Sequence, residues 1–291
     1  MDLQLTHRLN QARSIVNQAN ELGLKLPKAI AEAEKRTHLL DEVAQMPTPD
    51  ELANAKPADV EGLVFRLAIA AGVAQGQAGE TLRRARLLLQ SAYVDTVDNV
   101  CEALYDDVMA RLNDFEPTIT ANIGSVPEAL AHDPAQWVNF DATTRTAYAN
   151  VVDALKAAEP LVGFLKLVMG FSRRCALPTF GKWEVDGVVS LLPFYDVEEF
   201  TSPFLAALKL PTSNVLDVPT LVYLTQRDVN VRFVPLAVRR EAEKRLAAQA
   251  NEYVQTFDGR WALRSEVDED ELVRPSGLVT GVTNPKAVRL D

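Results

Sequence analysis

Residues 58–116 read ADVEGLVFRLAIAAGVAQGQAGETLRRARLLLQSAYVDTVDNVCEALYDDVMARLNDFE and contain no proline. Apolar residues recur there at steps of three and four, the spacing of one face of an α-helix. The first half keeps the seven-residue rhythm of a coiled coil, whereas four-residue steps dominate the second half and favour straighter packing. Gly72, Gly76 and Gly79 predict a bend or a short loop near residues 76–79. The stretch therefore predicts a long, interrupted helix that other helices must cover.

The residues before this stretch continue the helical pattern. A coiled-coil seam runs through Leu5, Leu9, Ala12, Val16 and Ala19. Gly23 offers a stop for that helix, and Pro27 suits the first turn of a second helix that ends at Met46 and Pro47. Residues 1–116 are therefore predicted to form a helical, coiled-coil-like module through which the chain associates with itself.

The rest of the chain divides into three predicted segments. Residues 117–134 contain three prolines and a Gly-Ser pair, which favours a linker with at most short helical turns. Residues 135–264 are predicted to form a smaller α+β module. Residues 265–291 are acidic, carry proline and glycine, and show little periodicity, which is typical of an extended or disordered tail. The expected fold class is mainly α with an α+β C-terminal part.

Three β-hairpins and two helices are expected in the α+β module. Asp-Gly pairs separate residues 182–185 from 188–192 and residues 253–257 from 260–264, as in hairpins with type I′ turns. Residues 221–225 and 229–234 form a third candidate pair of strands. A charged helix is expected from Pro235 to about Asn251. An apolar core helix is expected to include residues 161–171, a stretch too short to span a membrane.

The composition narrows the possible classes of function. The formal net charge is −10 at pH 7, so nucleic-acid binding would need a local basic patch. The two cysteines, Cys101 and Cys175, form neither a disulfide framework nor a zinc ribbon by their spacing. The polar N-terminus has no signal-peptide pattern, and we expect the protein in the cytoplasm. Arginine exceeds lysine, as in GC-rich genomes, so the host cytoplasm or a virion is expected if a phage encodes it.

Two charged patches on the long segment are the candidate interaction residues. They are the basic Arg83, Arg84 and Arg86 and the acidic Asp95, Asp98 and Glu102. This order opposes the preference of the helix dipole, so the patches gain nothing within their own helix. Two such helices in antiparallel orientation would place each patch opposite its complement. A solvated charged surface is the alternative interpretation.

No catalytic, cofactor-binding or metal-ligating residue is assigned from the sequence. His7, His38 and His132 are scattered, no serine lies in a G-x-S-x-G motif, and the glycines of residues 72–79 match no phosphate-binding loop. The acids Asp95, Asp98, Glu102 and Asp106 share one helix face, but a di-metal bundle would also need Glu-x-x-His motifs. The sequence therefore implies no cofactor.

The first hypothesis for function is a non-enzymatic structural or assembly protein. It would bind itself and other protein subunits, in a virion or another large complex. A second hypothesis is a metal-dependent enzyme that uses Asp95, Asp98 and Glu102 or the cluster Asp196, Glu198 and Glu199. A third is a nucleic-acid accessory protein that uses Arg83, Arg84, Arg86, Arg239 and Arg240.

Overall fold

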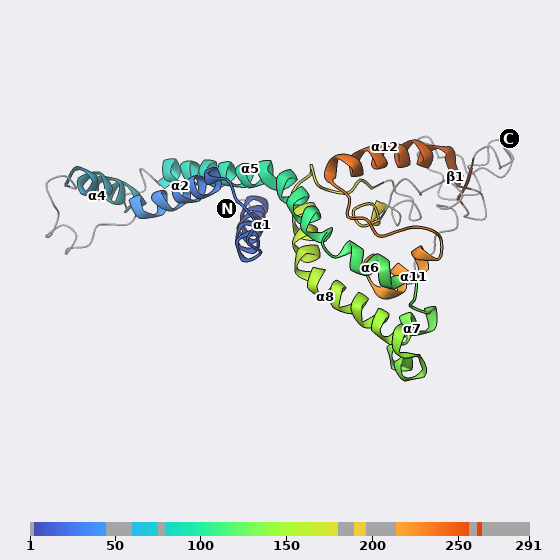
Figure 1. Ribbon diagram of the computed structural model, residues 1–291. Helices are drawn as coiled ribbons and strands as arrows, with labels where there is room; N and C mark the ends of the chain where they lie inside the picture. Colours follow the sequence, from blue (N-terminus) through green and yellow to red (C-terminus); the bar gives the residue numbers. More distant parts are fainter. Residues whose placement is uncertain are drawn as a thin grey trace, which may run out of the picture. The chain divides into compact units, whose positions relative to one another are not determined.

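The computed structural model describes residues 3–44, 60–74, 79–179, 189–195, 214–255 and 261–263, and most of these residues are helical (Figure 1). The chain forms two compact units. Unit 1 comprises Met1–Asp107 and Pro160–Ala176, and unit 2 comprises Val108–Glu159 and Leu177–Asp291. The segment boundaries expected at 117–134 and at 264 stay predictions. The elements are α1 (Leu3–Glu21), α2 (Lys28–Ala44), α4 (Val60–Ala74), α5 (Gly79–Leu112), α6 (Glu116–Ile123), α7 (Glu128–His132), η1 (Pro134–Asn139), α8 (Ala142–Phe171), α11 (Val218–Thr225), α12 (Leu236–Glu252), β1 (Tyr253–Gln255) and β2 (Trp261–Leu263).

Helix α1 of unit 1 follows the predicted seam and the predicted stop. Its buried residues are Leu9, Ala12, Ile15, Val16 and Ala19. Gly23 adopts φ 65°, a left-handed conformation that favours glycine, and the amide of Leu24 donates to the carbonyl of Ala19 at 2.8 Å. These features end the helix and satisfy one of its last carbonyl groups.

Most of the described residues in the long segment 58–116 lie in two helices, α4 and α5. Helix α4 ends at Ala74 and α5 begins at Gly79, where the glycine spacing predicts an interruption. Residues 75–78 lie outside the described residues. Helix α5 then continues for 34 residues, so the second half of the segment forms the longest helix among the described residues.

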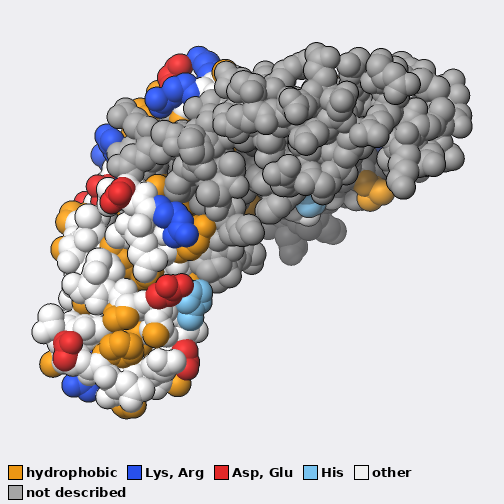
Figure 2. All heavy atoms as spheres, turned by 90° about the vertical axis from the view of Figure 1, so that its right-hand side faces the viewer, with side chains coloured by type: hydrophobic (Ala, Val, Ile, Leu, Met, Phe, Trp, Pro, Cys, Tyr) orange, Lys and Arg blue, Asp and Glu red, His pale blue; other side chains and the backbone are white. Residues whose placement is uncertain are grey.

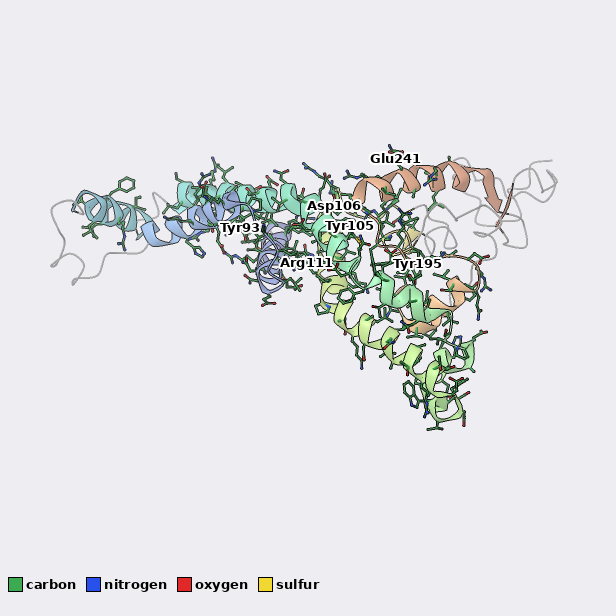
Figure 3. All side chains as sticks on the ribbon, viewed as in Figure 1. Tyr93, Tyr105, Asp106, Arg111, Tyr195 and Glu241 are labelled. Atoms are coloured by element: carbon green, nitrogen blue, oxygen red, sulfur yellow. The ribbon has the colours of Figure 1, made fainter. Side chains whose placement is uncertain are left out.

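Helix α5 and the end of α8 supply much of the core of unit 1. Tyr93 lies on the side of α5 toward α1 and α2 (Figure 3), and burial raises its pKa to about 12. Burial also raises the pKa of Cys101 to about 12, with a further contribution from Cys175, so the turn after α8 lies beside α5. The Arg8 guanidinium lies 5.1 Å from the ring centroid of Phe171, which links α1 to α8.

Helix α8 contains the predicted apolar core helix. Its buried residues in this stretch are Leu161, Val162, Phe164, Leu165, Val168 and Phe171. Pro160 lies inside the helix and cannot donate a backbone hydrogen bond, and the division between the two units falls at this residue. Among the described helices, none has the length and apolar character needed to cross a membrane.

Unit 2 packs short helices around buried aromatic and aliphatic residues. Helix α11 contacts α7 and α6. Asp217 caps α11, because its carboxylate accepts a 2.9 Å hydrogen bond from the amide of Thr220. The Tyr195 hydroxyl donates to the carbonyl of Val215 at 2.6 Å, which ties the turn of residues 190–195 to the segment before α11 (Figure 3).

The expected α+β module is wrong as a description of unit 2. Residues 221–225 belong to helix α11, and residues 229–234 contribute an isolated bridge between Val231 and Tyr195. Residues 190–194 form a turn where a strand is expected, and its partner at 182–185 lies outside the described residues. The described part of the chain contains one ladder, in which β1 pairs with β2 over three residues at the hairpin predicted for residues 253–257 and 260–264. A six-residue ladder does not change the predominantly helical character of the unit.

Candidate interaction surface

Two of the three arginines in the basic patch of α5, Arg83 and Arg84, are paired within their own helix, and the third, Arg86, is exposed. Nε and Nη2 of Arg83 donate to the two carboxylate oxygens of Glu80 at 2.9 and 3.0 Å, and Nε of Arg84 donates to Oε1 of Glu80 at 3.1 Å. Hydrogen bonds from Arg83 and then from Arg84 lower the pKa of Glu80. Glu80 lies in the first turn, where a negative charge suits the helix dipole. It therefore offsets the unfavourable position of the arginines.

The acidic patch divides into an exposed and a partly buried part. Asp95 is exposed, whereas Asp98 and Glu102 are half-buried. Oδ1 of Asp98 is buried and has no hydrogen-bond partner within the described ranges, and the charge of Asp98 raises the pKa of Cys101 after the effects of burial and of Cys175. Of the predicted acidic residues, Asp95 is thus the one that the fold leaves most accessible to a partner.

An exposed leucine lies between the two patches. Leu88 is 71% exposed, and Ala92, one turn later, is exposed as well. We define the solvent face of α5 as six exposed residues that share one side of the helix: Thr81, Arg84, Leu88, Ala92, Asp95 and Asn99. Sequence periodicity alone missed this face, because Leu88 continues the apolar seam.

Helix α4 exposes a second apolar surface in unit 1. It packs against α2, yet Val64, Phe65 and Leu67 are 58%, 61% and 38% exposed. Isolated exposed apolar side chains are common, but three within four residues of one helix concentrate apolar surface in one short segment. We call Val64, Phe65 and Leu67 the α4 patch.

The three histidines lie on three different helices, α1, α2 and α7. His7, His38 and His132 are each exposed, and His132 lies beside Glu128, with 3.9 Å between Nε2 and Oε1. Within the described ranges, no group of three histidine, cysteine, aspartate or glutamate side chains could hold a metal ion. The second acidic cluster proposed for metal binding, at residues 196–199, lies outside those ranges.

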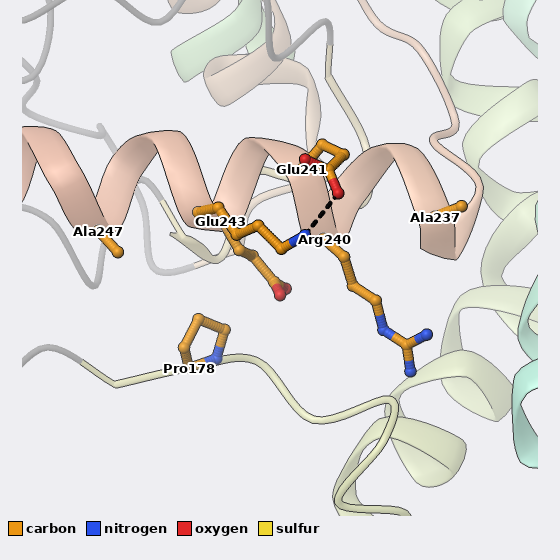
Figure 4. A pocket seen from close by; sticks show the side chains of 7 residues that line it. Pro178, Ala237, Arg240, Glu241, Glu243 and Ala247 are labelled. Carbon is orange, nitrogen blue, oxygen red and sulfur yellow. Dashed lines mark hydrogen bonds and ion pairs between the residues drawn. The ribbon is translucent and has the colours of Figure 1, made fainter.

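An open hollow of about 470 Å³ lies along α12 in unit 2 (Figure 4). Pro178 faces Glu243 across it, and Nζ of Lys244 is 2.7 Å from Oε1 of Glu241 on the exposed rim. Its lining consists of Pro178, Ala237, Arg240, Glu241, Glu243, Lys244 and Ala247. This lining contains paired charges and small apolar groups but no serine, cysteine or histidine that could act as a nucleophile or a general base.

Arg239 lies on the same helix, α12, and is fully buried. Its Nε lies 2.9 Å from Oε1 of Glu243, whose side chain is 15% exposed. Burial raises the pKa of Glu243, and the nearby charges of Arg239 and Arg240 oppose that effect. A buried guanidinium cannot reach a phosphate. The prediction that Arg239 contacts nucleic acid is therefore wrong.

A further apolar group lies at the end of unit 2 formed by α7 and η1 (Figure 2). Val138 is 76% exposed, and the neighbouring Trp137 ring packs edge-on against Tyr148 at 5.6 Å between ring centroids. The ring contact fixes η1 against α8, which leaves Val138 as the exposed member of the group.

No protein-family model, no curated protein and no solved structure matches this chain.

Proposed function

We propose that this protein is a non-enzymatic structural or assembly protein that associates with itself through its N-terminal helices. The α4 patch carries the proposal. Phe65, its largest side chain, is 61% exposed, and the residues of α4 carry no charge apart from Glu61 and Arg66. A surface of this kind is typical of a protein–protein contact, because water solvates it poorly in the free chain.

The exposed leucine of α5 supports the same proposal. Leu88 adds a second apolar group to unit 1, and charged residues of both signs flank it on the same helix. Apolar centres with charged surroundings are typical of association surfaces, in which burial provides affinity and charge provides orientation. Copies of the chain, together with other protein subunits, would then build a large complex such as a virion, in the cytoplasm of the cell that makes it.

Replacing Phe65 with lysine should weaken self-association of the full chain by about ten- to hundredfold, because burying a phenylalanine contributes about 1.5–3 kcal/mol. The measurement is a sedimentation-velocity series over protein concentration. The matched control is Val138→Lys, which adds the same charge at a site that is 76% exposed in unit 2.

Circular dichroism of both variants would establish that the helices are retained. Equal effects of Phe65→Lys and Val138→Lys on association would remove the α4 patch from the contact. The full chain is the appropriate sample, because unit 1 includes Pro160–Ala176 and a fragment of residues 1–116 would lack that part of its core.

A further inference from the structure

The solvent face of α5 has a self-complementary order of residues. Successive residues of an α-helix are about 100° apart, so Arg84, Leu88, Ala92 and Asp95 fall within roughly 80° of the helix circumference. All four are exposed. Along the axis, the basic residue comes first, the two apolar residues follow, and the acidic residue comes last.

The spacing of these residues is nearly symmetric about residue 90. Leu88 and Ala92 lie two residues on either side of that point, and Arg84 and Asp95 lie six residues before it and five after it. These separations correspond to axial distances of about 3 Å for the inner pair and about 8–9 Å for the outer pair. A two-fold axis perpendicular to α5 at residue 90 would therefore bring Leu88 to Ala92 of another copy and Arg84 to Asp95.

The charges favour this orientation over the parallel one. In a parallel pair in register, Arg84 would face Arg84 and Asp95 would face Asp95, so like charges would oppose one another. In the antiparallel pair, each charged residue faces its opposite, twice by symmetry. Arg84 can make this contact while it stays bonded to Glu80, since that bond uses Nε and a guanidinium has five N–H donors.

The apolar centre fits the same arrangement. Leu88 is 71% exposed, and the small side chain of Ala92 lets a facing helix approach to about 8 Å between axes. A leucine on one copy would cover the alanine of the other, and the reverse would occur across the axis. Arg83 and Glu102 of the predicted patches do not take part, because Arg83 holds Glu80 with two hydrogen bonds and Glu102 is half-buried.

We infer that a second copy of this chain docks antiparallel on the solvent face of α5, with Leu88 against Ala92 and Arg84 against Asp95 of the second copy. This inference rests on the proposed self-association and specifies its partner, orientation and register.

Cross-linking of full-length chains tests the register. One sample carries Leu88→Cys, another carries Ala92→Cys, and the two are mixed and oxidised with diamide, which takes up the two thiol hydrogens. The mixture should form a disulfide-linked dimer several-fold faster than either sample alone. The native Cys101 and Cys175 are fully buried, and the unsubstituted chain measures any contribution that they make.

Charge reversal tests the outer contact. Arg84→Asp or Asp95→Arg alone should weaken association by about three- to tenfold, and the double variant should restore it. Asp107→Arg is the matched control, since Asp107 is an exposed acid of α5 outside the solvent face. High salt should reduce the difference between the single and double variants.

The outcomes separate this inference from the proposed function. If the unsubstituted chain oligomerises but the mixed cysteine samples do not cross-link preferentially, and the two charge reversals are simply additive, the register is overturned and self-association stands. If the unsubstituted chain is monomeric at every concentration, both proposals are overturned.

Discussion

Replacing Arg239 with alanine should lower the free energy of unfolding by about 3–5 kcal/mol, a large part of the stability of a typical domain. The reason is that Arg239 is fully buried and lies 2.9 Å from Glu243, so its removal leaves a mostly buried carboxylate without that partner. Urea denaturation followed by circular dichroism measures the loss. The loss should be greatest at neutral pH.

The pH dependence follows from the direction of the Glu243 shift. Burial raises the pKa of Glu243 in the folded chain, and loss of Arg239 removes a charge that lowers it. A carboxyl group with a raised folded-state pKa binds its proton more readily when folded, so the penalty on the charged form is present above that pKa and is relieved as the pH falls through it. The Arg239→Ala variant should therefore recover part of its stability relative to the unsubstituted chain under mildly acidic conditions.

Two controls accompany this variant. Arg240→Ala removes the same charge from the next residue, which is half-buried, and should have a much smaller effect. A double variant, Arg239→Met with Glu243→Leu, should be close to neutral because it removes both buried charges and keeps their volume. Equal, small losses for Arg239→Ala and Arg240→Ala would contradict the structural role of the buried pair.

Replacing Leu104 with alanine should destabilise the chain by about 2–5 kcal/mol, because its side chain is buried in the core and the substitution leaves a cavity. Leu104 lies on α5 and is 1% exposed. The same substitution at Leu88 should change the stability of the monomer by less than about 0.5 kcal/mol. Thermal unfolding of the two variants at low concentration measures both effects.

This pair of substitutions separates folding from association on one helix. Leu88 is 71% exposed, so the fold does not need it, whereas the proposed contact does. A loss of stability at Leu88→Ala as large as that at Leu104→Ala would mean that Leu88 is a core residue, and it would remove the solvent face of α5 as a docking surface.

The sequence predicts the N-terminal helices well because their apolar residues keep helical spacing over many turns. In α1, four of the five seam residues, Leu9, Ala12, Val16 and Ala19, are buried as the pattern requires. The stop at Gly23 follows from its left-handed backbone conformation. Local propensity and tertiary packing agree in this part of the chain.

The prediction of a strand at residues 221–225 is wrong, and the reason is visible in the sequence. The run at residues 221–225 consists of four apolar residues and a threonine, and an apolar run of that length fits a buried strand or a buried helix equally well. The discriminating signal lies just before it, where Asp217 provides an N-cap and Pro219 lies in the first turn. Weighing these two residues would have identified α11.

The candidate surface could be predicted only in part. The spacing of Glu80 from Arg83 and Arg84 is enough to predict ion pairs within the helix, and that signal was available. The spacing of Arg239 and Glu243 predicts a pair but not its burial, because burial depends on packing against residues distant in the sequence. The exposure of Leu88 could not be predicted for the same reason.

The mass of the full chain in solution, measured by multi-angle light scattering over a range of concentration, tests the central claim most directly. A self-associating chain should give a weight-average mass above the 32.0 kDa of the monomer, rising with concentration into the high micromolar range, about 100 µM. A mass that stays at 32.0 kDa over the whole range would contradict self-association through the N-terminal helices.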